Sequence, residues 1–202
     1  VQAFGKIPIK AKKLGIDLLS ASGHKIHSLK GSGFLYVRNG ARVITPVYGG
    51  GQESGIRSGT QNTPGIAALS VAVNEAFDGL DRNYELVSRL NLQLKNALSA
   101  MECVKINSPE NSLPFILSFS VCGVRSEILL HSLEASGVYV SSGSACSKGK
   151  KSGVLSAMGL SDERIDSAIR VSFSKYNTAD DVDLLVKALN DALSHIKRKS
   201  CR

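Results

Sequence analysis

Two short segments of this sequence combine residue types that can do chemistry, and the first contains Lys25. Lys25 lies two residues after Gly23, beyond the apolar run 16–20. A lysine that is held in place and partly desolvated can form a Schiff base, and the neighbouring Ser22 and His24 can donate hydrogen bonds to a phosphate. On these residues alone, a surface lysine in a loop is the better explanation.

The second segment, 141–147, contains Cys146 among small polar residues and one glycine. A nucleophilic cysteine needs access to its reaction partner and some thiolate character. The composition is typical of an exposed loop, and Lys148, Lys150 and Lys151 can supply positive potential unless ion pairs neutralise them. Taken in isolation, the segment is explained better by an ordinary exposed cysteine.

Both interpretations change because the sequence matches one family over a long stretch. From residue 2 to residue 62 the chain resembles the NifS/IscS-like cysteine desulfurases of the class V aminotransferase superfamily almost without a gap. The run Ser-Ser-Gly-Ser-Ala-Cys at 141–146 is a specific signature of the same family. One departure is Ser28-Leu29, where the family usually has Gly-Pro. In the first half the resemblance is carried by the segments 2–8, 22–25, 30–33 and 49–53.

The resemblance implies a cofactor, pyridoxal 5′-phosphate (PLP), and a set of residues that hold it. It implies that Lys25 forms the Schiff base with PLP and that Ser22 and His24 contact the phosphate. Gln2 is implied as the hydrogen-bond partner of the ring hydroxyl. Thr60, in the loop 57–60, is implied as a contact of the phosphate in the neighbouring subunit, which means a homodimer with active sites at its interface.

The resemblance also implies a reaction, the removal of sulfur from L-cysteine. Cys146 attacks the sulfur of a PLP-bound cysteine, which leaves L-alanine and a Cys146 persulfide, with PLP as the electron sink. Arg170 clamps the substrate carboxylate, since a guanidinium fork fits a carboxylate with two hydrogen bonds. Without the resemblance, a surface ion pair would explain Arg170 at least as well. The implied sulfur acceptors are an iron–sulfur scaffold protein or a tRNA thiolation enzyme. Cys146 is also a candidate transient iron–sulfur ligand, and no other metal site is predicted.

Two other functions stay open at this stage. A selenocysteine lyase would carry the same local motifs, because its substrate differs by one chalcogen atom. A non-catalytic sulfur-carrier or interaction module would use Cys146 to accept sulfur and would hold no PLP. The aspartate, histidine and asparagine that the family uses upstream of this region are absent from these residues, so we predict that the 202 residues alone bind PLP poorly and do not turn over.

The elements that must position these residues follow from apolar periodicity and turn residues. The fold implied by the resemblance is α/β, a PLP-dependent transferase of fold type I. In it, 1–80 form the end of the large PLP-binding domain and 81–202 an α+β C-terminal small domain that carries the cysteine loop. We predict strands at 16–20, 33–37 and 43–47, with a turn at Asn39-Gly40 between the last two. A helix then begins with Thr63 as its cap and Pro64 at its first position, and Asp78-Gly79 is a weak break.

The second half predicts helices that pack on a small sheet. From residue 82 onward an apolar stripe of period 3.6 indicates a helix, and the alternation at 115–121 indicates a half-buried strand. Ser126 is predicted to cap a helix that Gly137 ends, and strands are predicted at 138–140 and 169–173. A capping-box pattern at Thr178 opens the final helix.

Composition excludes several classes of function. The net charge is +8, but the basic clusters at 148–151 and 197–202 are not interleaved with aromatic residues, so we predict no nucleic-acid binding. No apolar run reaches about 18 residues and no secretory leader is visible, so we predict no membrane span. The cysteines form no C-x-x-C pair, which favours a reducing cytoplasm. Cys103 and Cys122 are predicted to be packing residues, and Cys201 lies next to the C-terminus.

Overall fold

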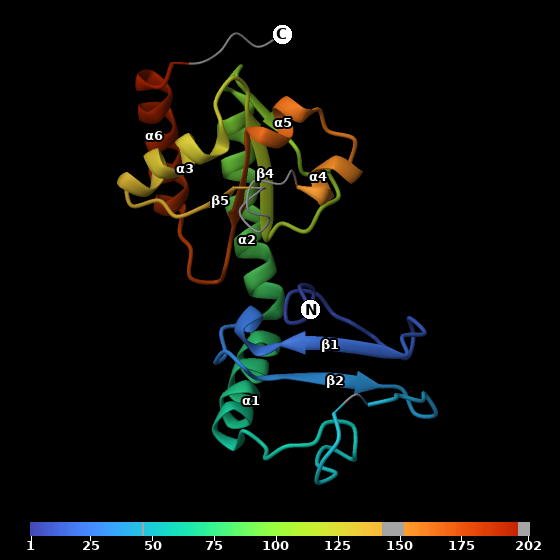
Figure 1. Ribbon diagram of the computed structural model, residues 1–202. Coiled ribbons are helices and arrows are strands. Elements are labelled where there is room, and N and C mark those ends of the chain that lie inside the picture. Colours follow the sequence, from blue (N-terminus) through green and yellow to red (C-terminus); the bar gives the residue numbers. More distant parts are fainter. Residues whose placement is uncertain (46, 143–151, 198–202) are drawn as a thin grey trace. The chain divides into compact units, whose positions relative to one another are not determined.

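The structure of the chain is a computed structural model that describes residues 1–45, 47–142 and 152–197 (Figure 1). Contacts divide the chain into two compact units, Val1–Arg82 and Asn83–Arg202. None of the helices within the described ranges has the length and apolar character needed to cross a membrane.

The first unit is built on two antiparallel strands. Strand β1 (Leu18–Ser22) pairs with β2 (Gly33–Val37), and the 3-10 helix η1 (Gly23–Ile26) follows β1 directly. The strand predicted at 33–37 is confirmed, and the one predicted at 16–20 occurs two residues later. The strand predicted at 43–47 is wrong for the described residues of that segment. There the Thr45 hydroxyl donates to the Ile56 carbonyl (2.5 Å) and accepts from the Val47 N–H (3.1 Å), and such local bonds compete with a strand ladder.

Helix α1 (Thr63–Asp78) completes the first unit. Its cap is Asn62, whose Oδ1 accepts from the Gly65 N–H at 3.1 Å, so the prediction of Thr63 as the cap is wrong by one residue. The helix buries Ala72 and Ala76 against Ile26 of η1. This small core therefore fixes the turn that follows β1.

The second unit begins in helix α2 (Leu80–Ser99), which starts after Gly79 and so confirms the predicted break at Asp78-Gly79. Its predicted apolar stripe is buried, with Leu94 and Leu98 completely inaccessible. The unit contains a four-stranded antiparallel sheet of order β3-β4-β6-β5. The strands are β3 (Val104–Ile106), β4 (Ile116–Val121), β5 (Ser141–Ser142) and β6 (Ala168–Ser172). The remaining helices are α3 (Ser126–Ala135), α4 (Gly153–Ala157), α5 (Asp162–Asp166) and α6 (Ala179–His195).

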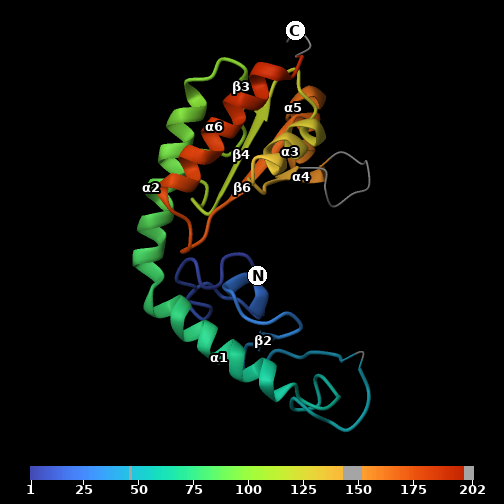
Figure 2. The same ribbon diagram turned by 90° about the vertical axis from the view of Figure 1, so that its left-hand side faces the viewer.

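The two faces of this sheet have different characters. Alternate residues of β4 and β6, such as Phe119 and Ile169, enter the main core together with residues of α2, α3 and α6. Figure 2 shows these helices beside β4 and β6. The opposite face carries Ser118 and Arg170, which are paired across the β4–β6 ladder. Part of that face packs on α4 and α5 through a small separate cluster of Leu155, Leu160, Ile165 and Ala168. The sheet thus has one apolar face and one partly polar face.

Several local predictions in the second unit are confirmed and others are corrected. Gly137 ends α3 with a φ of 77°, and the capping box at Thr178 is present. Ser126 is the first residue of α3 and not its cap, which is Arg125. Residues 138–140 form no strand, because pairing with β6 begins only at Ser141. Strand β3 and the short helices α4 and α5 were not predicted, since each is too short to show a period.

Candidate functional site

Lys25 lies where a strand ends and a tight turn begins. It belongs to η1, directly after β1, and its side chain is exposed, as is that of His24. Ser22, the last residue of β1, is half-buried. The structure therefore brings Ser22, His24 and Lys25 together at one end of the β1–β2 pair. None of the ion pairs found among the described residues involves Lys25.

Two glycines let the backbone close tightly at this turn. The Gly23 N–H donates to the Ser32 carbonyl at 2.9 Å, and a Cβ on Gly23 would lie 2.8 Å from the Ser32 hydroxyl oxygen. A Cβ on Gly33 would lie 2.4 Å from the carbonyl oxygen of Ala21, which is backbone and cannot yield. The turn that carries Lys25 thus requires a residue without a side chain at two positions, Gly23 at the start of η1 and Gly33 at the start of β2.

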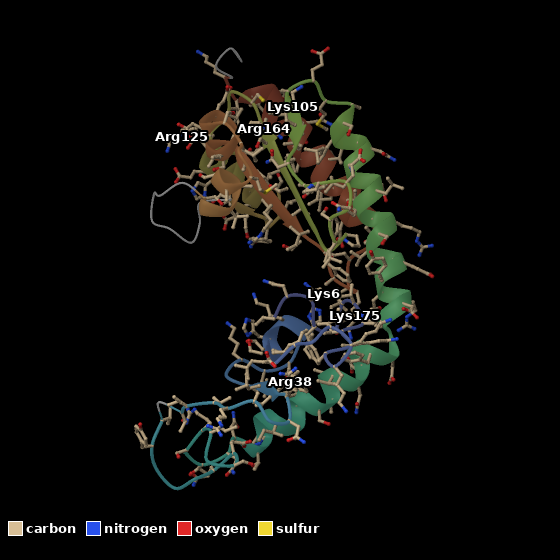
Figure 3. All side chains as sticks on the ribbon, turned by 90° about the vertical axis from the view of Figure 1, so that its right-hand side faces the viewer. Lys6, Arg38, Lys105, Arg125, Arg164 and Lys175 are labelled. Carbon is tan, nitrogen blue, oxygen red and sulfur yellow. The ribbon has the colours of Figure 1, made fainter. Side chains whose placement is uncertain are left out.

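A second lysine belongs to the same neighbourhood. Lys6, labelled in Figure 3, is half-buried in the first unit. Burial, followed by the positive charge of Lys25, lowers the pKa of its ammonium group. This electrostatic coupling means that the two amines lie close enough to repel each other. Sequence reasoning missed Lys6, because nothing in the spacing of 6 and 25 shows that the chain folds one back onto the other.

A phosphate-bearing cofactor fits this end of the first unit on the chemistry of its donors. The Ser22 hydroxyl and the His24 ring can both donate hydrogen bonds to an anion, and the amine of Lys25 is adjacent to them in the chain as the group that would attach the cofactor. A phosphate would also relieve the repulsion between Lys6 and Lys25. The residues present therefore fit the phosphate of PLP, and the lysine stands beside them.

Gln2 and Thr60, the other two predicted cofactor contacts, are not hydrogen-bonded to Lys25 in the part of the chain that the structure describes. Both are exposed, and no hydrogen bond among the described residues joins either of them to Lys25. Thr60 lines a cavity of about 830 Å³ in the first unit, together with Arg57 and apolar side chains of β2. The loop before it is held by Gln52, whose Oε1 accepts from the Gly59 N–H at 3.0 Å.

Arg170 lies in the second unit, on the polar face of the sheet. It is exposed in the middle of β6, and its Nη2 donates to the Ser141 hydroxyl of β5 at 3.3 Å. No ion pair found in the described part of the chain involves this guanidinium. Arg170 thus presents a cationic fork without a carboxylate, in contrast to Arg125, which contacts Glu127 and Asp166.

The predicted cysteine nucleophile cannot be placed with these residues. Cys146, the lysines at 148–151 and Cys201 lie outside the described residues. Cys103 packs against the main core as predicted, and Cys122 is half-buried. Within the described ranges no cluster of three or more His, Cys, Asp or Glu side chains could hold a metal ion.

The second unit also contains a buried polar cluster that the sequence did not reveal. Arg164 of α5 donates through Nη2 to the carbonyl oxygen of Ile106 (2.8 Å) and to Asn107 Oδ1 (2.6 Å) (Figure 3). Asn107 in turn donates to the Ser120 hydroxyl at 2.8 Å, and Ser120 donates to the Arg164 carbonyl at 2.6 Å. The cluster ties α5 to β3 and β4. No signal short of a tertiary contact could have identified it, because Arg164 and Asn107 are 57 residues apart.

Comparison with known proteins gives one consistent result. Residues 1–185 match the family model described as aminotransferase class-V. The cysteine desulfurase IscS of Clostridium botulinum is 37% identical over 195 residues, which cover 94% of this chain and 49% of that protein. A solved NifS-like protein matches with a TM-score of 0.89 at 38% identity, over 97% of this chain and 51% of that one. A NifS-like protein from Rickettsia africae matches with a TM-score of 0.88 at 31% identity, over 96% and 52% respectively.

These matches settle the fold and the family. The chain spans about half the length of the curated relatives it matches. The likeness to NifS-like structures confirms the predicted α/β fold of PLP-dependent transferases. Class V aminotransferases and cysteine desulfurases depend on PLP, which confirms the predicted cofactor at the level of the family. The family model covers far more than half of the chain, and the chain therefore belongs to the class V aminotransferase family.

Proposed function

We propose that this chain is part of a cysteine desulfurase that moves sulfur from L-cysteine to Cys146. The observation that carries the proposal is the position of Lys25, an exposed amine at a strand end, beside Ser22 and His24 and outside the ion pairs of the described residues. The similarity to desulfurases over 94% of the chain supports the same reaction. We assign 1–80 to the end of the large cofactor-binding domain and 81–202 to the small domain.

Each of the candidate cofactor-binding residues has a role that follows from its chemistry. Lys25 attaches the cofactor, and Ser22 and His24 donate hydrogen bonds to its phosphate. Gln2 donates to the ring hydroxyl. Thr60 serves the phosphate of a neighbouring subunit, which requires a homodimer. Its exposed position on the first unit is compatible with such a contact.

The proposed reaction balances without an external oxidant or reductant. L-cysteine and the Cys146 thiol give L-alanine and a Cys146 persulfide, so one sulfur atom is transferred and no proton is lost overall. PLP supplies the electron sink for breaking the carbon–sulfur bond when it is bound. Arg170 holds the substrate carboxylate through its guanidinium fork. The outer sulfur of the persulfide then passes to an acceptor protein in the cytoplasm, such as an iron–sulfur scaffold or a tRNA thiolation enzyme, and the Cys146 thiol is restored.

Chemical trapping of the cofactor tests the role of Lys25. The chain is incubated with PLP, reduced with borohydride and digested, and the labelled lysine is identified by mass spectrometry. We expect most of the label on Lys25. Lys30→Ala, which removes another exposed lysine of the same region, leaves the label in place, whereas Lys25→Ala removes it. Lys6 is the chemical competitor, because its lowered pKa leaves a larger fraction of its amine unprotonated and able to react with PLP. Label on Lys6, or label spread over all lysines, contradicts the proposal.

A persulfide assay tests the role of Cys146 in the complete PLP-loaded enzyme of which we propose this chain to be a part, because the 202 residues alone are predicted not to turn over. Supply of L-cysteine is expected to leave a persulfide that alkylation and mass spectrometry locate on Cys146. Cys103→Ala is the matched control, because Cys103 packs against the core. Release of sulfide together with an unmodified Cys146 would refute the proposed transfer. Faster turnover of selenocysteine than of cysteine would instead favour a selenocysteine lyase.

A further inference from the structure

A row of three polar residues crosses the polar face of the sheet in the second unit. Arg170 of β6 stands opposite Ser118 of β4 on one side and opposite Ser141 of β5 on the other. Residues directly opposite in antiparallel strands have Cβ atoms about 5 Å apart. Both neighbours of Arg170 are therefore small hydroxyl side chains, which leave its guanidinium open to solvent and offer hydrogen-bonding groups beside it.

Ser141 accepts a hydrogen bond from Arg170, with Nη2 to Oγ at 3.3 Å, and no other side chain among the described residues is hydrogen-bonded to this guanidinium. Strand β5 is only two residues long, and both of its residues are half-buried. Ser141 is therefore held on the sheet by its pairing, and it can hold Arg170 in turn. An exposed arginine otherwise samples many rotamers, and ordering it costs conformational entropy.

The hydrogen bond to Ser141 leaves the arginine able to bind a carboxylate. A guanidinium has five N–H groups, which form two double-pronged edges that share Nη2. Whichever Nη2 hydrogen Ser141 accepts, the other edge stays complete. No ion pair among the described residues engages Arg170, so no carboxylate within those residues takes that edge.

We infer that Ser141 is a positioning residue that holds the guanidinium of Arg170 in a carboxylate-binding orientation. The inference rests on the role given to Arg170 in the proposed function, and it adds a residue that sets how tightly the carboxylate is bound. Ser141 acts through Arg170 and transfers no proton. Its contribution appears in carboxylate affinity and in the mobility of the arginine side chain.

Nuclear magnetic resonance of the complete 202-residue chain tests this inference without the cofactor. L-alanine is titrated while the Nε–Hε signal of Arg170 is followed, and L-alaninamide, which lacks the carboxylate, is the control ligand. Ser141→Ala is expected to weaken L-alanine binding about fivefold, the effect of one ordinary hydrogen bond, because the Arg170–Ser141 bond is long at 3.3 Å and exposed. It is also expected to speed rotation of the guanidinium. Ser142→Ala, which alters the neighbouring residue opposite Ile169, leaves both quantities unchanged.

A matched pair of substitutions guards against a loss of folding. Ser141→Thr and Ser141→Val have the same shape, and only threonine keeps the hydroxyl, so threonine should bind L-alanine more tightly than valine. Equal affinity in this pair, or in Ser141→Ala and the unaltered chain, overturns the inference. If Arg170→Ala still binds L-alanine, or if the unaltered chain does not bind it, the proposed role of Arg170 in binding the substrate carboxylate is refuted, and the role of Ser141 is refuted with it. A response lost in Arg170→Ala but unchanged in Ser141→Ala refutes the role of Ser141 alone.

Discussion

Replacement of Ser120 by alanine should destabilise the second unit, because Ser120 lies at the centre of the buried polar cluster. Its side chain is completely inaccessible, and its hydroxyl donates to the Arg164 carbonyl at 2.6 Å and accepts from Asn107 Nδ2 at 2.8 Å. The substitution leaves both partners short of one bond. A buried polar group that loses its partner costs about 1–3 kcal/mol.

With two partners affected, the expected loss of stability lies at the lower end of twice this range, because each partner of Ser120 also has a second, longer hydrogen-bond contact. Asn107 Nδ2 also lies 3.4 Å from the Ser118 hydroxyl, and the Arg164 carbonyl accepts from Ser167 at 3.4 Å. These two longer contacts reduce the cost of leaving the partners unpaired, so we expect Ser120→Ala to lower the free energy of unfolding by about 2 kcal/mol and not by twice that amount. That free energy corresponds to an approximately 30-fold change in an opening equilibrium.

Amide hydrogen exchange along β4 is the appropriate assay, because it reports on the second unit alone. The slowest amides of β4 should exchange about 30-fold faster in Ser120→Ala. Ser118→Ala is the matched control on the same strand and face. Among the described residues the Ser118 hydroxyl makes one hydrogen bond, the 3.4 Å contact with Asn107, so exchange should change by about twofold or less.

A double substitution tests whether the cluster acts as one unit. Asn107→Ala should itself destabilise, because it leaves an Arg164 Nη2 hydrogen without its acceptor at 2.6 Å. Combined with Ser120→Ala, it should cost about 1 kcal/mol less than the sum of the two, since both variants break the same hydrogen bond. Strict additivity, or a cost for Ser120→Ala no larger than for Ser118→Ala, would refute the reasoning.

Three further outcomes follow from single contacts. Thr178→Ala removes the capping box of α6 and should cost about 1 kcal/mol, measured by exchange of α6 amides. A hydrogen bond from the Thr178 N–H lowers the pKa of Asp181 in the folded chain. The ionised Asp181 therefore stabilises the fold fully above the pKa that it has in the unfolded chain. This contribution to stability should be lost as the pH falls below about 4. Asp181→Asn should flatten that pH dependence. Gly33→Ala forces a Cβ to within 2.4 Å of the Ala21 carbonyl and should destabilise the β1–β2 pair by about 1–3 kcal/mol, whereas Gly153→Ala meets no atom within 4 Å and should be neutral.

Local sequence predicted many elements because their signals lie within a few residues. The apolar stripe of α2, the break at Gly79, the end of α3 at Gly137 and the capping box at Thr178 are all where the pattern placed them. Two of the errors arose where a local side-chain hydrogen bond replaces the predicted element. Asn62 caps α1 in place of Thr63, and the Thr45 hydroxyl bonds within a loop that reads as a strand.

The sequence by itself determined the family, the cofactor and the identity of the candidate residues, because these depend on motifs that can be read without a fold. Only the tertiary structure decided which residues are neighbours. Ser141 faces Arg170 across 29 residues of sequence, and Arg164 reaches Asn107 across 57. Periodicity states which face of a strand a side chain occupies, but it does not state which strand lies alongside. The order β3-β4-β6-β5 places β5 beside β6, and this pairing brings Ser141 opposite Arg170.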